Sequence, residues 1–97
     1  MKYMVQVEID PQAGVTIEDN PQLIQEMIGK WQAHKPIGMY FSLTRRSVTV
    51  ILEASNEDAF LEALHATWRV VKSYPNVHPV ADVNEFPQIL KRVGVAK

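Results

Sequence analysis

Apolar and polar residues alternate in four short segments of the chain, a pattern that predicts half-buried β-strands. These segments span residues 3–9, 37–43, 47–52 and 77–83. In the first, Tyr3, Val5 and Val7 alternate with polar residues until Asp10-Pro11 ends the strand. From there to Asn20 the sequence has no strong pattern, so a loop is expected.

The second and third strands are close enough in the chain to form a hairpin. A loop of two or four residues centred on Arg45-Arg46 would pair Leu43 with Val48 and Phe41 with Val50. Paired residues share a face of the sheet, so this register places both apolar sets together.

Helical spacing of apolar residues predicts two long helices and one short one. The first begins at Asn20-Pro21, a capping residue followed by a proline suited to the first turn, and ends near His34. The second follows Ser55-Asn56-Glu57-Asp58, which resembles a capping box. Its predicted buried stripe is Phe60, Leu61, Leu64, Trp68 and Val71. A short helix over residues 87–93 would bury Ile89, Leu90 and Val93, with Gly94 after its end.

The order strand, helix, strand, strand, helix, strand predicts an α+β, ferredoxin-like βαββαβ sandwich with a short C-terminal helix. Right-handed crossovers place the first and third strands in the centre of an antiparallel sheet with strand order 4-1-3-2. Both long helices then cover one face of the sheet. The predicted core is Val5, Val7, Phe41, Val50, Leu61, Leu64 and Trp68.

The opposite face of the predicted sheet stays open and is chemically mixed. It gathers the polar residues Gln6, Glu8, Tyr40, Ser42, Thr49, His78 and Asp82, together with Met4, Ile51 and Val80. Uncovered apolar surface of this extent usually marks an interface. We therefore expect a homodimer or higher homo-oligomer, in which two such sheets face each other as a dimeric α+β barrel around a cavity.

Composition narrows the possible functions. The 97 residues fit one domain, residues 1–97, and 46% of them are hydrophobic, as in an ordinary globular core. A net charge of −1 gives no electrostatic footprint for nucleic acid. Cysteine is absent, and no apolar run approaches the ~20 residues that cross a membrane. We expect a cytoplasmic protein with neither nucleic acid nor a membrane as partner.

The chain resembles a known family in its order of elements, its length and several short stretches. These are Tyr3-x-Val5-x-Val7, Glu62-Ala63-Leu64-His65, Tyr74-Pro75 and Ala81-Asp82-Val83. The pattern is similar to that of the muconolactone isomerase-like proteins, which belong to the dimeric α+β barrels. The resemblance implies transfer of a proton within a small unsaturated lactone, without metal or cofactor. An anionic lactone needs a cation to bind its carboxylate, and the open face offers one only if Lys2 or an arginine reaches in.

Three side chains of the open face are candidates for catalysis. His78 is the candidate proton shuttle, and Glu8 on the neighbouring strand could orient it or share its proton. Tyr40 could donate a hydrogen bond to an enolate oxygen. Gln6, Ser42, Thr49 and Asp82 are candidate substrate-binding residues. Each also has a structural explanation, such as cross-strand pairing for Ser42 with Thr49.

Metal chemistry is not expected, because His34, His65 and His78 lie on separate elements without ligand spacing. Two classes of function remain. One is a cofactor-free isomerase that moves a proton in a small lactone or other carbonyl compound. The other is a non-catalytic homodimeric module that binds a small ligand or a partner. An acid–base pair within hydrogen-bonding reach in the cavity would favour the isomerase.

Overall fold

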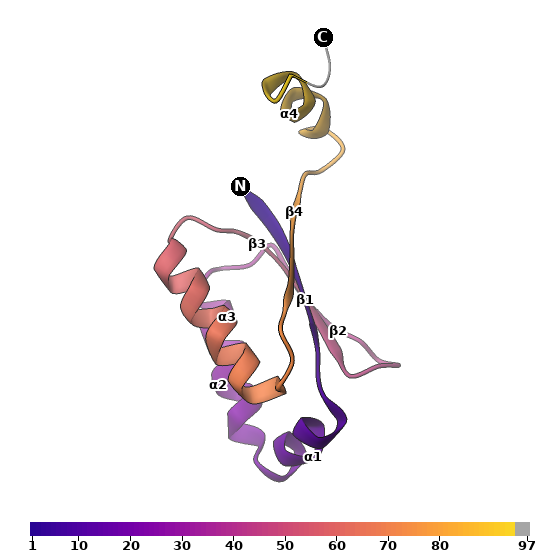
Figure 1. Ribbon diagram of the computed structural model, residues 1–97, viewed down its shortest axis with the longest axis vertical. Coiled ribbons are helices and arrows are strands. Elements are labelled where there is room, and N and C mark those ends of the chain that lie inside the picture. Colours follow the sequence, from indigo (N-terminus) through magenta and orange to yellow (C-terminus); the bar gives the residue numbers. More distant parts are fainter. Residues whose placement is uncertain (95–97) are drawn as a thin grey trace.

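The computed structural model describes residues 1–94 and has the predicted α+β class, with four strands and four helices (Figure 1). Residues 95–97 of the predicted domain lie outside the described residues. The elements, in chain order, are β1 (Lys2–Glu8), α1 (Pro11–Asp19), α2 (Pro21–Gln32), β2 (Gly38–Phe41), β3 (Ser47–Glu53), α3 (Glu57–Val71), β4 (Asn76–Val80) and α4 (Phe86–Arg92).

The four strands form one antiparallel sheet in the order β2-β3-β1-β4, which reads 4-1-3-2 from the β4 edge. β1 and β3 pair over their whole length and occupy the centre. The edge strands hold Gly38 and Pro79. Proline cannot donate a ladder hydrogen bond, so its place in an edge strand follows from backbone chemistry.

Helices α2 and α3 lie side by side against one face of the sheet (Figure 1). Inward-facing residues of β1 and β3 form the centre of the core, and the predictions for Val5, Val7 and Val50 are confirmed. The fully or nearly fully buried cluster is Val5, Val7, Met27, Trp31, Val48, Val50, Leu52, Ala63 and Val71. All four helix residues of this cluster come from α2 and α3, which fixes this face of the sheet as the covered one.

The predicted buried stripe of α3 is wrong for Leu61 and Trp68. The helix buries Ala63, Thr67 and Val71 instead, while Leu61 is 61% exposed. At about 100° per residue, Leu61 lies about 120° and Trp68 about 100° around the helix from Thr67. The small side chains bring α3 close to the sheet, and Thr67 accepts a hydrogen bond from the indole N–H of Trp31 at 2.7 Å. Leu64 is half-buried.

The loop expected before Asn20 is in fact helix α1. Asp10 caps it, because its carboxylate accepts from the backbone N–H groups of Gln12 and Ala13, and Pro11 fits the first turn. Ala13 and Ile17, four residues apart, supply a narrow buried face. Such a short helix has too few apolar positions for periodicity alone to predict it.

The hairpin between β2 and β3 has a longer loop than predicted. Phe41 pairs with Val48 and Met39 with Val50, a shift of two residues that keeps every side chain on its predicted face. The predicted burial of Phe41 is wrong, because Phe41 is 47% exposed in the edge strand β2, and Leu43 lies in the loop and is almost fully exposed. Ser42 shapes this loop, since its hydroxyl oxygen accepts from the backbone N–H groups of two following residues.

The C-terminal part also differs from prediction. Strand β4 ends at Val80, so Ala81 to Val83 are not part of it. Helix α4 forms and is followed by Gly94 with a φ of 79°, as expected for a left-handed residue after a helix. However, α4 buries no residue, and it stands beyond the end of the sheet, along the 54 Å long axis of the molecule (Figure 1). The predicted burial of Ile89, Leu90 and Val93 is therefore wrong within one chain.

Candidate functional site

The open face of the sheet, opposite α2 and α3, carries side chains in rows across the four strands. The strand register defines two full rows. One row consists of Gly38, Ile51, Met4 and His78, and the next consists of Tyr40, Thr49, Gln6 and Asn76. The first row is apolar at its centre and the second is polar, so the face is mixed as predicted.

Tyr40 bends back over the glycine of its own strand. A methyl group at Gly38 would lie only 2.6 Å from the Tyr40 ring, so glycine is what allows the ring to lie there. Tyr40 as a whole remains 64% exposed. Tyr40 pairs with Thr49, which pairs in turn with Gln6, so these three predicted site residues do come together.

Ser42 does not face Thr49, and the predicted pairing of these two residues is wrong. The shifted hairpin register places Tyr40 opposite Thr49 and leaves Ser42 in the loop. Because the hydroxyl oxygen of Ser42 already accepts from the N–H groups of Thr44 and Arg45, its role in this structure is that of a turn residue.

His78 and Glu8, the predicted acid–base pair, are not in contact within the described chain. His78 pairs across the strands with Met4, and Glu8 lies four residues further along β1. At about 3.3 Å per residue this offset is about 13 Å. Glu8 accepts a hydrogen bond from the guanidinium of Arg45 at 3.2 Å instead, and both side chains are well exposed. The acid–base pair that would favour catalysis is thus missing from a single chain.

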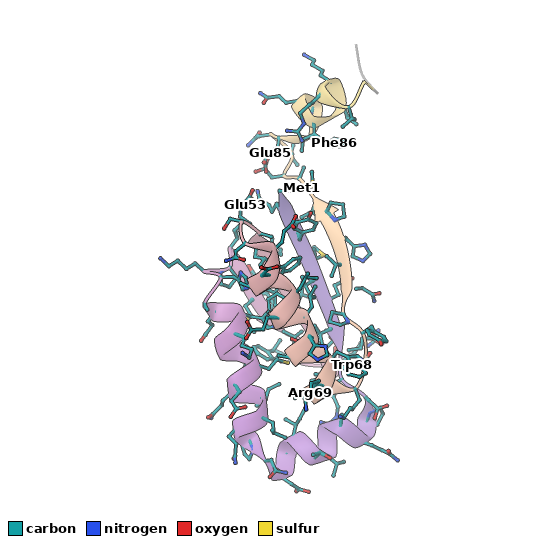
Figure 2. The ribbon with its side chains drawn as sticks, turned by 60° about the vertical axis from the view of Figure 1, so that its left-hand side comes forward. Met1, Glu53, Trp68, Arg69, Glu85 and Phe86 are labelled. Atoms are coloured by element: carbon teal, nitrogen blue, oxygen red, sulfur yellow. The ribbon has the colours of Figure 1, made fainter. Side chains whose placement is uncertain are left out.

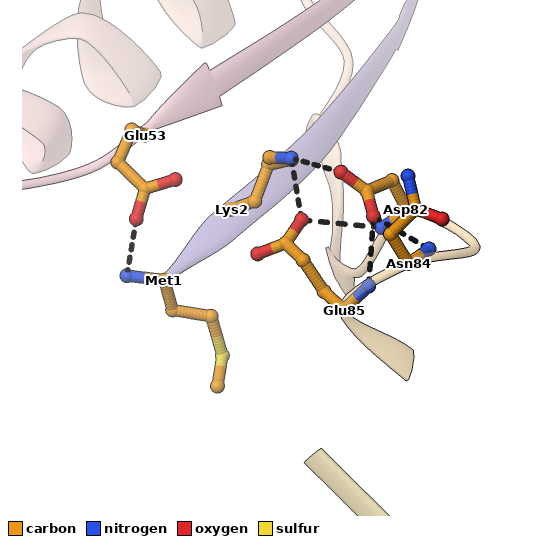
Figure 3. Close-up of polar contacts among 6 residues, drawn as sticks. All are labelled: Met1, Lys2, Glu53, Asp82, Asn84 and Glu85. Carbon is orange, nitrogen blue, oxygen red and sulfur yellow. Dashed lines mark hydrogen bonds and ion pairs between the residues drawn. The ribbon is translucent and has the colours of Figure 1, made fainter. Parts of the chain in front are cut away.

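Asp82 joins a charged network at the end of the open face (Figure 3). The Lys2 ammonium contacts a carboxylate oxygen of Glu85 at 2.7 Å and one of Asp82 at 3.5 Å. The hydrogen bond to Glu85 is the main cause that raises the pKa of Lys2 above its ordinary value. The pKa of Asp82 is lowered, chiefly because its carboxylate accepts the backbone N–H of Glu85.

A hollow of about 500 Å³ lies beside this network, between the end of the sheet and α4. Its wall combines open-face residues with one side of the helix, and the lining residues are Met1, Lys2, Glu53, Val80, Glu85, Gln88, Ile89 and Arg92. We call this hollow the end pocket. Lys2 therefore does reach the end of the open face, and Arg92 supplies a second cation there.

A second hollow, of about 450 Å³, lies on the other side of the sheet, between α3 and the β4 edge. We call it the α3–β4 groove, and it is lined by Leu61, Leu64, His65, Trp68, Tyr74, Pro75 and Val77. The rings of Trp68 and Tyr74 stack with centroids 5.5 Å apart. Trp68 lies toward the end of the molecule away from Glu85 and Phe86 (Figure 2).

Within residues 1–94, no group of three or more histidine, aspartate or glutamate side chains is arranged to hold a metal ion. None of the helices in that range is both long and apolar enough to span a bilayer.

Residues 1–94 match a protein-family model described as a domain of unknown function (DUF3303). The chain belongs to the DUF3303 family. No curated protein matches it significantly. Because the DUF3303 description names no activity, the resemblance to muconolactone isomerase-like proteins stays a prediction.

Two residues of the end pocket in this DUF3303 chain, Glu85 and Arg92, were missed by sequence reasoning. A signal for Glu85 was present, because Asp82-Val83-Asn84-Glu85 has the spacing of a capping box. Its two hydrogen bonds are both formed: Asp82 accepts the N–H of Glu85 at 2.8 Å, and Glu85 accepts the N–H of Asp82 at 3.3 Å. No pattern could indicate that Arg92 faces the sheet, since that depends on where the helix lies.

Proposed function

We propose that the protein is a homodimeric module that binds a small organic molecule between the open faces of two sheets. The observation that carries this proposal is the uncovered row with Met4 and Ile51 at its centre, beside the polar row of Tyr40, Thr49 and Gln6. Apolar contact area with a few convergent polar groups is typical of ligand sites.

The chemistry of the face suggests what kind of molecule would bind. The amide of Gln6 and the hydroxyls of Thr49 and Tyr40 can donate and accept hydrogen bonds, while Met4 and Ile51 offer apolar contact. At the end of the face, Lys2 and Arg92 provide cations next to acidic residues. A small apolar carboxylic acid or lactone, with one polar end, would match this distribution.

The dimer is tested by sedimentation velocity on the full chain at micromolar concentration. Ile51→Asp would bury an unpaired charge in the interface and should convert the dimer into an 11.0 kDa monomer. Val15→Asp is the matched control, because Val15 is 55% exposed and belongs to helix α1, not to the sheet. A monomeric wild-type chain would overturn the proposal, and so would an Ile51→Asp variant that stays dimeric.

Ligand binding is tested by calorimetric titration with a panel of small lactones and short aromatic acids. Gln6→Leu should weaken any hit, because it removes the donor and acceptor at the centre of the polar row. Gln12→Leu on α1 is the control. If no member of the panel binds the dimer, the proposed ligand class is wrong.

A proton-transfer isomerase is the second candidate, favoured by the fact that His78, Glu8 and Tyr40 all belong to the open face. It ranks second because Glu8 is about 13 Å along β1 from Met4, the strand partner of His78, and accepts a hydrogen bond from Arg45. If a lactone screen finds turnover, His78→Ala should lower it about 10²–10⁴-fold. An unchanged rate would remove His78 from the mechanism.

We also propose a cytoplasmic location, which the absence of cysteine supports, since a reducing compartment gives no use for disulfides.

A further inference from the structure

We infer that helix α4 is an exchanged arm, which docks in the α3–β4 groove of a second copy of this chain. This inference rests on the homodimer proposed above and adds to it the exchange of a specific element. In this arrangement α4 of one chain fills the groove of the other, and the groove buries the apolar side chains of α4.

No apolar side chain of helix α4 is fully buried by its own chain: Phe86 is exposed and Leu90 is only half-buried. Phe86, Leu90 and Val93 recur at the spacing of a single helix face, while Ile89 faces the end pocket. The helix has seven residues, and isolated helices shorter than about 12–15 residues are marginal in water. An ordered α4 with this stripe needs a second contact surface.

The groove matches α4 in length and polarity. A seven-residue helix is about 10 Å long, and the same seven-residue step separates Leu61 from Trp68 along α3. Two rims of the groove, Leu61 and Tyr74, are strongly exposed for apolar side chains. Leu61 contributes little to the core of its own chain. A contact with another chain best explains why a leucine occupies this exposed position on α3.

Charges favour one orientation of the arm, antiparallel to α3. The last turn of α4 carries Lys91, next to Arg92 of the end pocket, and the first turn of α3 carries Glu57 and Asp58. Antiparallel docking brings these opposite charges together. It also places the amino end of α4 beside the carboxyl end of α3, so that the two helix dipoles attract each other.

The chain cannot make this contact with itself while the segment before α4 keeps its described position. That segment is held to β1 by the two ion pairs of Lys2. Phe86 and Trp68 consequently lie toward opposite ends of the molecule (Figure 2). In the proposed dimer the twofold axis lies between the two facing sheets and is perpendicular to their strands. The strands of the two chains then run in opposite directions, and α4 of one chain comes toward the Trp68 end of the other.

The test measures acrylamide quenching of tryptophan fluorescence on full-length dimers whose mass is checked by sedimentation. Trp31 is buried in the core, so the change reports on Trp68. Leu90→Glu and Leu61→Glu should each raise the quenching of Trp68 to that of an indole that is half-buried by its own chain alone. Gln88→Glu, which adds the same charge to the other side of α4, should leave it unchanged. Circular dichroism verifies that each variant is folded, and Val93→Glu replaces Leu90→Glu if that variant is not.

Mixing the two variants distinguishes exchange from docking within one chain. A mixed dimer of Leu90→Glu and Leu61→Glu chains contains one intact arm and one intact groove on different chains, so half of the lost protection should return. No recovery in verified mixed dimers would overturn the exchange. A Leu90→Glu dimer with Trp68 still protected would also overturn it, while leaving the proposed dimer intact. A wild-type monomer would overturn both.

Discussion

The buried hydrogen bond between Trp31 and Thr67 gives the sharpest prediction about stability. Both side chains are almost completely removed from solvent. The indole N–H of Trp31 donates to the Thr67 hydroxyl oxygen at 2.7 Å, and that hydroxyl donates to the Ala63 carbonyl at 2.8 Å. Thr67→Val keeps the branched shape but removes the only described acceptor of the indole.

The magnitude follows from these contacts. A buried donor left without a partner costs about 1–3 kcal/mol. The added methyl group recovers at most about 0.8 kcal/mol of transfer free energy, and no cavity forms because valine and threonine have the same shape. The free energy of unfolding should therefore fall by about 1–2 kcal/mol. For a chain of this size the midpoint temperature should fall by about 4–8 °C per kcal/mol.

Urea denaturation measures this effect in four variants: Thr67→Val, Thr67→Ser, Trp31→Phe and the Trp31→Phe/Thr67→Val double variant. Thr67→Ser keeps the acceptor and loses one methyl group, so it should cost less than Thr67→Val. The two single changes should be coupled by about 1 kcal/mol, because each removes the same hydrogen bond. A Thr67→Val protein as stable as wild type, with an unchanged denaturant slope, would refute the reasoning.

Other parts of the chain give further predictions. Leu52→Ala should cost about 2–5 kcal/mol in chemical denaturation because Leu52 is fully buried, whereas Leu43→Ala in the hairpin loop should change stability by less than about 0.5 kcal/mol; equal losses would contradict the fold. Asn56→Ala should cost about 0.5–2 kcal/mol by removing the acceptor of the Ala59 N–H at the start of α3, and a neutral result in thermal unfolding would speak against this cap. The pKa of Asp82 is lowered in the fold, so its stabilisation is present above its ordinary value of 3.8 and is lost as the pH falls through the lowered pKa. Asp82→Asn should accordingly flatten the acid limb of stability against pH, and an unchanged limb would exclude Asp82 as its source.

Strand alternation predicted the sheet well, because a period of two is set by the backbone itself. Val5, Val7 and Val50 are buried as expected, and the hairpin shift of two residues preserved every face. The helix faces were harder to predict. Choosing the largest apolar side chains placed Trp68 and Leu61 inside, but close approach of α3 to the sheet selected Ala63 and the hydrogen-bonding Thr67.

The sequence predicted which residues lie on the open face, but not which of them contact one another. Gln6, Thr49 and Tyr40 lie together because strand alternation puts them on one face and the strand pairing places them opposite one another. His78 and Glu8 lie apart, because the pairing of β4 with β1 cannot be read from the sequence. A loop of unknown length separates α3 from β4, so a two-residue error moves a side chain by about 7 Å along the strand. The end pocket was unpredictable for a related reason: it depends on where α4 lies after β4 ends.

The position of β1 between β3 and β4 has a consequence for synthesis of the chain. The first strand to leave the ribosome needs the last one to complete its pairing, since β4 is the neighbour of β1 on one side. About 27 residues separate the end of β3 from the end of β4. At about 5–20 residues per second, one edge of β1 stays unpaired for about 1–5 seconds after β3 has been made. During that interval the nascent sheet presents bare backbone donors and acceptors, which makes it a substrate for chaperones that bind extended segments.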